Sequence, residues 1–125
     1  MVQTQISCGT DIIEISRIQQ SIDKLGDKFI NTIYTKKEIE YCESHKNNKY
    51  QHYAARFATK EALYKALSGI FPEDYLKWKA FEVINTKHGK PYIEIKDPRI
   101  KSLDISISHC KEYAVATVVV LYEKN

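Results

Sequence analysis

Residues 53–67 read YAARFATKEALYKAL, and this stretch decides the fold. At 3.6 residues per turn, apolar or small side chains would surround most of the helix that it forms. A helix that is apolar nearly all round is mostly buried in its protein. The pattern therefore predicts a long central helix, from about Tyr50 to Leu67, that ends at Ser68-Gly69.

Shorter elements are predicted on both sides of this helix. Isoleucines at positions 15, 18 and 22 have helical spacing and predict a helix that ends at about Leu25. A capping box that begins at Thr35 predicts a second helix that runs to about Ser44. Patterns of period two predict strands at residues 4–13, 80–85, 92–95, 103–108 and 114–122. One N-terminal strand, a helical half and a strand-rich half make α+β the expected fold class.

The composition fits one small domain. The chain has 125 residues, 43% of them hydrophobic, which suits a single domain over residues 1–125. Its apolar runs are too short for a membrane span and residues 1–5 lack a signal-peptide pattern, so we expect a cytoplasmic protein with no membrane partner. Nineteen basic and 16 acidic residues leave a net charge of +3, too weak to indicate nucleic acid binding.

Two charged residues interrupt the apolar surface of the predicted helix. Glu61 and Lys65 lie four residues apart and would project together between two apolar edges. Charges in such surroundings are costly unless they are paired or bind a metal. An ordinary exposed ion pair is the alternative, but the apolar neighbours favour a functional site in which the lysine is buried.

Asp11 is unusual for its predicted strand, because aspartate is depleted in strands and two isoleucines follow it directly. Gly9 would leave room for a ligand to approach the backbone nearby. A turn-forming aspartate that caps the next helix is an equally good interpretation of the local pattern.

Other polar residues give weaker signals. His109 ends an apolar strand face, where a histidine is more often structural than catalytic. A group of basic residues before and along the long helix is expected to be mostly ordinary solvated surface: Lys46, Lys49, His52, Arg56 and Lys60.

Two carboxylates, a lysine and surrounding cations suit a pyrophosphate bound with Mg²⁺. Magnesium usually takes one or two protein carboxylates and completes its octahedron with phosphate oxygens and water. Because phosphoryl-type transfer needs mainly positioning and charge neutralisation, few protein groups suffice.

Five segments together resemble the bacterial holo-acyl-carrier-protein synthases, the short type within the 4′-phosphopantetheinyl transferase family. They are GTDIIEISRI at 9–18, FINTIYTKKE at 29–38, RFATKEALYKAL at 56–67, GKPY at 89–92 and ISISH at 105–109. They follow the family's order and approximate spacing, and the match covers nearly the whole chain.

The resemblance implies a compact domain with an antiparallel-type sheet packed against one long and several shorter helices. It implies an enzyme of fatty acid biosynthesis that transfers 4′-phosphopantetheine from coenzyme A to a serine of apo acyl carrier protein and releases 3′,5′-ADP. It further implies a homotrimer with active sites at the subunit interfaces.

The resemblance also implies a role for each matching site residue. Asp11 and Glu61 would bind Mg²⁺, and Glu61 would take the serine proton, directly or through a water. Lys65 would stabilise the attacked phosphate and the departing 3′,5′-ADP. The residues implied to line the coenzyme A site are Arg56, Lys65, Gly89, Pro91 and His109.

Carrier proteins of this kind are acidic, so a basic docking surface is expected beside the metal. Arg17 and Lys24 lie seven residues apart and so close to the same helical face, with Lys28 just beyond the helix. Arg17 lies within the family-like segment, and its planar fork suits carboxylates. For Lys24 and Lys28, ordinary exposed cations on an amphipathic helix are an equally good interpretation.

Three alternatives remain at this stage. A non-enzymatic domain that binds an anionic nucleotide or an acidic protein would share the basic residues but would not need two converging carboxylates. A cysteine hydrolase that uses Cys110 beside His109 is disfavoured, because neighbours on a strand point to opposite faces. Zinc at Cys42 and His45 has helical spacing but lacks a second matching pair.

Overall fold

The computed structural model of the chain describes residues 3–70 and 77–124. The first half contains β1 (Gln3–Glu14), α1 (Ile15–Leu25), α2 (Asp27–Ile33), α3 (Lys36–Ser44) and α4 (Lys49–Leu67). The second half contains β2 (Val83–Asn85), β3 (Pro91–Ile93), β4 (Ile100–His109) and β5 (Tyr113–Lys124).

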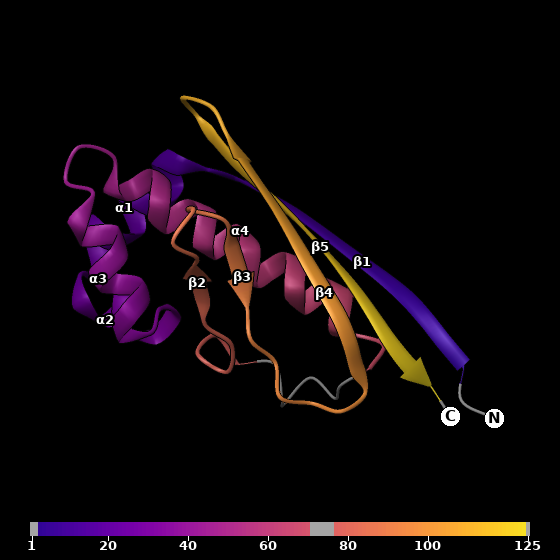
Figure 1. Cartoon of the computed structure of the whole chain (residues 1–125). Coiled ribbons are helices and arrows are strands. Elements are labelled where there is room, and N and C mark those ends of the chain that lie inside the picture. The colour runs from indigo at the N-terminus through magenta and orange to yellow at the C-terminus, as the bar shows by residue number, and fades with distance from the viewer. Residues whose placement is uncertain (1–2, 71–76, 125) are drawn as a thin grey trace.

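Three long strands form an antiparallel sheet in the order β1-β5-β4. Helix α4 lies along one face of this sheet, and the short β2–β3 hairpin lies beside α4 (Figure 1). Alanines of α4, among them Ala58, Ala62 and Ala66, pack against Ala116 and Val118 in the core between helix and sheet. The predicted α+β class and antiparallel sheet are therefore confirmed.

The central helix is confirmed as well, and most of its length is buried. Its small side chains allow a close approach to the sheet, which is why α4 can run across both β1 and β5. The predicted capping box is present at the start of α3: the Glu38 amide donates to Thr35 Oγ1 at 3.3 Å, and the Thr35 amide donates to Glu38 Oε1 at 2.7 Å.

Two predictions from periodicity need correction. Helix α2 was not expected, because Gly26, with φ of 60°, separates its single short apolar face from α1. The strand expected over residues 80–85 is reduced to Val83–Asn85. Ahead of it the chain turns, with the Ala80 amide donating to Lys77 O at 3.0 Å.

None of the helices in the described part of the chain is long and apolar enough to cross a membrane.

Candidate active site

The first cluster of site residues lies where β1 crosses α4. The ammonium group of Lys65 lies 3.3 Å from Asp11 Oδ1 and donates to Thr10 O at 2.9 Å. The Asp11 side chain is 18% exposed, whereas that of Lys65 is 52% exposed. The expected meeting of Asp11 with the α4 charges is therefore present, but the expectation of a buried lysine is wrong, because the Lys65 side chain is about half exposed.

Glu61 completes this cluster from the preceding turn of α4. Burial raises the pKa of its carboxyl group, the negative charge of Asp11 raises the pKa further, and Lys65 lowers it. Two carboxylates that repel one another and are only partly offset by one lysine form a site that favours a cation. They fit Mg²⁺, which commonly takes two protein carboxylates. Within residues 3–70 and 77–124 no group of three or more His, Cys, Asp or Glu side chains could hold a metal.

Gly9 has a role different from the expected one. A Cβ atom at this position would overlap Ala62 O and lie 2.8 Å from Ala66 N, both backbone atoms of α4. Ser7 adds a hydrogen bond from its hydroxyl to Ala66 O at 2.6 Å. The glycine therefore admits the helix rather than a ligand, and this close approach sets the distance between Asp11 and the charges of α4.

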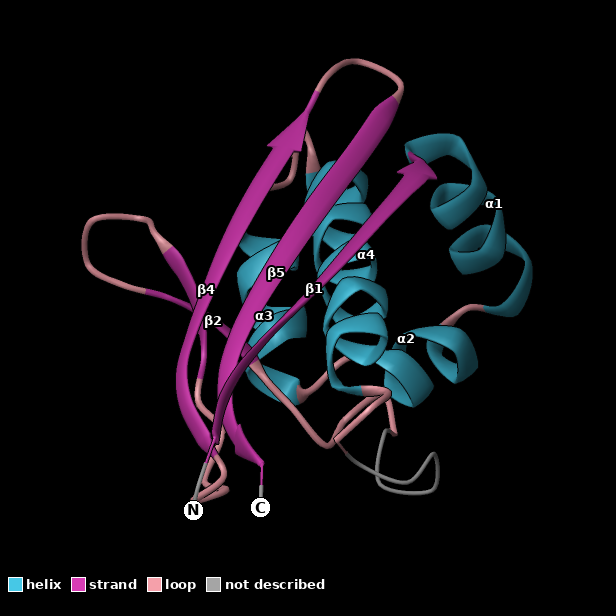
Figure 2. Cartoon of the chain, turned by 90° about the vertical axis from the view of Figure 1, so that its right-hand side faces the viewer, coloured by secondary structure: helices cyan, strands magenta, loops and turns pink. Residues whose placement is uncertain are grey.

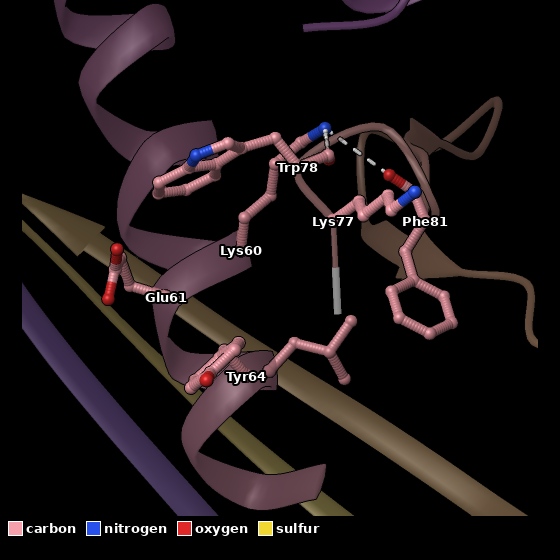
Figure 3. A pocket seen from close by; sticks show the side chains of 7 residues that line it. Lys60, Glu61, Tyr64, Lys77, Trp78 and Phe81 are labelled. Atoms are coloured by element: carbon pink, nitrogen blue, oxygen red, sulfur yellow. Dashed lines mark hydrogen bonds between the residues drawn. The ribbon is translucent and has the colours of Figure 1, made fainter. Parts of the chain in front are cut away.

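A pocket of about 190 Å³ opens on the other side of Glu61. Figure 3 shows Glu61 at its rim, with Trp78 and Tyr64 on either side of it and Phe81 farther from it. Trp78 is held in place by stacking on Phe57, with ring centroids 4.9 Å apart. A mostly apolar hollow thus adjoins the first cluster.

The second cluster surrounds Arg56, which is buried with only 3% exposure. Its guanidinium lies 3.9 Å from the centre of the Tyr41 ring, and Nη2 donates to Asn85 Oδ1. Asn85 in turn donates from Nδ2 to Gly89 O at 3.0 Å. Arg56 and the turn before Pro91 are therefore connected through the Asn85 side chain.

His109 lies beside the N-terminal part of α4, where its Nδ1 is hydrogen-bonded to the amide nitrogen of Gln51. Near it, the rings of His45 and His52 lie 4.1 Å apart. Burial lowers the pKa of His52 to about 4, and the positive charges of His45, Arg56 and His109 lower it in the same direction. Arg56 carries a permanent positive charge and the neighbouring imidazole rings carry N–H donors, so this surface favours an anion.

The two clusters are separate within one chain. Arg56 and Glu61 are five residues apart on α4, which places them about 140° apart around the helix. Across the described residues, no hydrogen bond or ion pair joins one cluster to the other. Each chain thus presents two partial sites in different directions.

Lys60 was expected on the solvated surface, and that expectation is wrong. Its ammonium lies 2.8 Å from Glu38 Oε1 and donates to the backbone carbonyl groups of Ile33, Trp78 and Phe81. Burial lowers its pKa, although Glu38 opposes this shift. The signal that could have revealed it is the spacing from Arg56: four residues place both on one side of a helix that is apolar nearly all round.

The proposed docking residues are all exposed: Arg17, Lys24 and Lys28. Arg17 and Lys24 lie on α1, whose Ile18 and Ile22 are buried against the body of the protein. Lys28 belongs to α2. Leu25, 51% exposed, adds an apolar side chain next to these cations.

The surroundings of Cys42 and Cys110 do not favour the zinc site or the cysteine hydrolase considered above. Cys42 is fully buried, and burial raises the pKa of its thiol to about 12. His45 Nδ1 is hydrogen-bonded to Tyr41 O at 2.7 Å, so this nitrogen is not available to a metal. Cys110 is exposed, while the neighbouring His109 contacts Gln51.

The antiparallel sheet with α4 along one face, and the carboxylate–lysine cluster between them, fit a transferase of phosphate-bearing groups. The chain belongs to the 4′-phosphopantetheinyl transferase superfamily, whose profile matches residues 7–118.

Individual relatives show which members of this superfamily the chain resembles. The chain is 42% identical over 120 residues to the holo-[acyl-carrier-protein] synthase of Ruminiclostridium cellulolyticum, covering 90% of this chain and 89% of the relative. Among solved structures, it resembles the holo-(acyl-carrier-protein) synthase of Bacillus anthracis in complex with coenzyme A (3′,5′-ADP), with 34% identity, a TM-score of 0.80 and coverage of 96% and 99%. It likewise resembles the Helicobacter pylori synthase in complex with coenzyme A, with 30% identity, a TM-score of 0.80 and coverage of 90% and 98%. The resemblance predicted from the sequence is confirmed.

Proposed function

We propose that this protein transfers 4′-phosphopantetheine from coenzyme A to a serine of an apo acyl carrier protein, with Mg²⁺ held by Asp11 and Glu61. The observation that carries this proposal is the meeting of Asp11, Glu61 and Lys65 where β1 crosses α4. Relatives named holo-[acyl-carrier-protein] synthase, which this chain matches over about nine-tenths of their length, support the reaction, as do the coenzyme A complexes of similar structures. The proposed setting is the cytoplasm, in fatty acid biosynthesis.

In this reaction the serine oxygen attacks the β-phosphate of coenzyme A. The new bond joins that oxygen to phosphorus, and the bond from phosphorus to the pyrophosphate bridging oxygen breaks, so that 3′,5′-ADP leaves. Glu61, whose pKa is raised, is suited to accept the serine proton. Lys65 is exposed enough to reach the phosphate and bears the charge that stabilises both the attacked group and the leaving group.

Mg²⁺, when bound, would neutralise phosphate charge and orient the pyrophosphate. On this proposal, Arg56, His109 and the Gly89–Pro91 turn bind the rest of coenzyme A. Support comes from the cationic surroundings of His109 and from the connection between Arg56 and the turn.

We also propose the homotrimer that the resemblance implies, and the apolar outer face of the sheet along β1 and β5 supports a contact between chains. Ile6 and Ile12 of β1 are 70% and 62% exposed, and Leu121 of β5, which pairs with Ile6, is 37% exposed. Figure 2 shows this face with α4 behind it and no element in front of β1 or β5. Apolar faces of this kind mark contacts between proteins. A neighbouring copy could then complete each site, by joining the first cluster of one chain to the second cluster of another.

The rival function is a domain that only binds an anionic nucleotide or an acidic protein. It would bind coenzyme A without releasing 3′,5′-ADP and would not require a divalent cation. We expect 3′,5′-ADP release that needs Mg²⁺ and an apo carrier and that stops with EDTA. Tight coenzyme A binding without such release would favour the rival.

A further inference from the structure

The β2–β3 hairpin holds the turn that is proposed to contact coenzyme A, yet its own structure is slight. Each strand has three residues, and a two-stranded hairpin by itself is only marginally stable. Within the turn, the Thr86 amide donates to Lys90 O and the Gly89 amide donates to Thr86 O, both at 2.9 Å. The position of this turn must therefore depend on contacts outside the hairpin.

One outside contact is weak. Lys90 and Asp104 form an ion pair at 3.1 Å, but their side chains are 63% and 71% exposed. Solvent-exposed pairs contribute little to stability, since water and salt screen them.

The strands themselves are anchored, since Val83 and Ile93 are buried in the core and the Val83 amide donates to Glu38 Oε2 at 2.8 Å. The turn beyond the strands has a second contact, through Asn85, the last residue of β2. Its side chain accepts a hydrogen bond from Arg56 Nη2 and donates one to Gly89 O at 3.0 Å. A guanidinium can only donate, so the amide oxygen must face Arg56 and the amide nitrogen must face the turn. A side-chain amide carries both an acceptor and a donor in one planar group, which is what this bridge requires.

Arg56 makes the bridge rigid at its other end. It lies in the middle of α4, 3% exposed, with its guanidinium over the Tyr41 ring. Its Nε is buried and has no hydrogen-bond partner in the described residues. Because a buried cation with an unmet donor gains strongly from each remaining hydrogen bond, the Asn85 contact should persist.

We propose that Asn85 is a positioning residue, which ties the Gly89–Pro91 turn to the buried Arg56 and so fixes that turn for coenzyme A. The brace itself follows from the contacts of Asn85. Its consequence for coenzyme A rests on the proposed function.

The test uses Asn85→Asp and Asn85→Ala in the full chain. Asp keeps the acceptor for Arg56 but replaces the donor by an oxygen that would face Gly89 O, and Ala removes both contacts without adding charge. For both variants we expect an approximately tenfold rise in the dissociation constant and KM for coenzyme A, because the turn loses its brace. The kcat at saturating coenzyme A and the KM for the carrier should stay within about twofold. Asn31→Asp, an exposed asparagine on α2, is the matched control.

Hydrogen exchange of the Gly89 and Lys90 amides gives a readout that needs no ligand. We expect faster exchange in both Asn85 variants and unchanged exchange in Asn31→Asp. Unchanged exchange would overturn the brace, and faster exchange with unaltered coenzyme A affinity would overturn the positioning role. A rise in KM for Asn85→Asp alone, abolished by high salt, would indicate simple charge repulsion and would also overturn it. If the wild-type chain binds no coenzyme A, the proposed function fails, and the exchange result still decides the brace.

Discussion

The closest approach between β1 and α4 should be sensitive to a single methyl group, introduced as Gly9→Ala. The new Cβ would overlap Ala62 O and lie 2.8 Å from Ala66 N and 3.0 Å from Ala62 C. All three are backbone atoms of a buried helix, so no flexible side chain can move away, and the strand and helix must separate. Overpacking of this kind costs roughly 1–3 kcal/mol, and backbone contacts place this case near ~3 kcal/mol.

For a domain of this size, ~3 kcal/mol corresponds to a fall in Tm of roughly 10 °C. Activity should fall further than stability, because Asp11 is two residues away and moves with the strand. A misplacement of about 1 Å in a catalytic group can cost ~100-fold in rate, so we expect kcat/KM to fall by about that factor well below Tm.

The assays are a thermal melt followed by circular dichroism and steady-state transfer at a temperature where the variant is folded. Gly69→Ala is the matched control, since no atom lies within 4 Å of a Cβ placed there. It should leave both Tm and activity unchanged. A Gly9→Ala protein with wild-type Tm and activity would refute the reasoning that this approach positions Asp11.

Three further predictions concern the charged groups. Asp11→Asn and Glu61→Gln should each abolish transfer, and both variants should stay folded. Because the pKa of Glu61 is raised in the native state, the native apo protein binds more protons than the unfolded chain as pH rises above 4.5, and its stability falls there. Glu61→Gln should therefore raise the apo Tm at pH 7 but not below pH 4.5. Normal turnover in either variant at saturating Mg²⁺ would contradict the metal assignment. Mixing Asp11→Asn chains with His109→Ala chains should restore activity if each site joins two subunits. Mixing Asp11→Asn chains with Lys65→Ala chains should not, since Asp11 and Lys65 share one cluster. Failure of the first mixture despite proven subunit exchange would argue for sites within one chain. Arg17→Glu should raise the KM for the carrier at least tenfold, or ~1.4 kcal/mol, with little change for coenzyme A, and an unchanged carrier KM at low salt would remove Arg17 from the docking surface.

Elements with strong periodicity were predictable from the sequence. The stretch 53–67 marks α4 because its apolar residues recur at every helical angle, and Thr35 marks the start of α3 because a capping box is a local pattern. Helix α2 was missed, since seven residues carry too little periodicity. Residues 80–82 were predicted as strand, but the chain turns there, and the ammonium group of Lys60 binds the carbonyl oxygens of Trp78 and Phe81.

The candidate site was predictable where charges interrupt an apolar pattern, and less so where contacts are long-range. Asp11 and Glu61 stood out in this way, and the structure brings them into electrostatic contact. The spacing from Arg56 could have indicated that Lys60 is buried, but not that Glu38 is its partner, and no spacing indicated that Lys65 is exposed. Nor could composition or spacing link Asn85 to Arg56, 29 residues away, because that contact exists only after the hairpin has folded onto α4.

The central claim, that this chain modifies a carrier serine, is tested most directly by weighing the carrier. An apo acyl carrier protein is incubated with coenzyme A, Mg²⁺ and either the wild-type chain or Glu61→Gln, and its intact mass is measured. The account predicts a gain of one phosphopantetheine group with the wild-type chain, located on a single serine, and no gain with Glu61→Gln or with EDTA. An unchanged mass for several apo carriers in the presence of the folded wild-type chain and Mg²⁺ would contradict it.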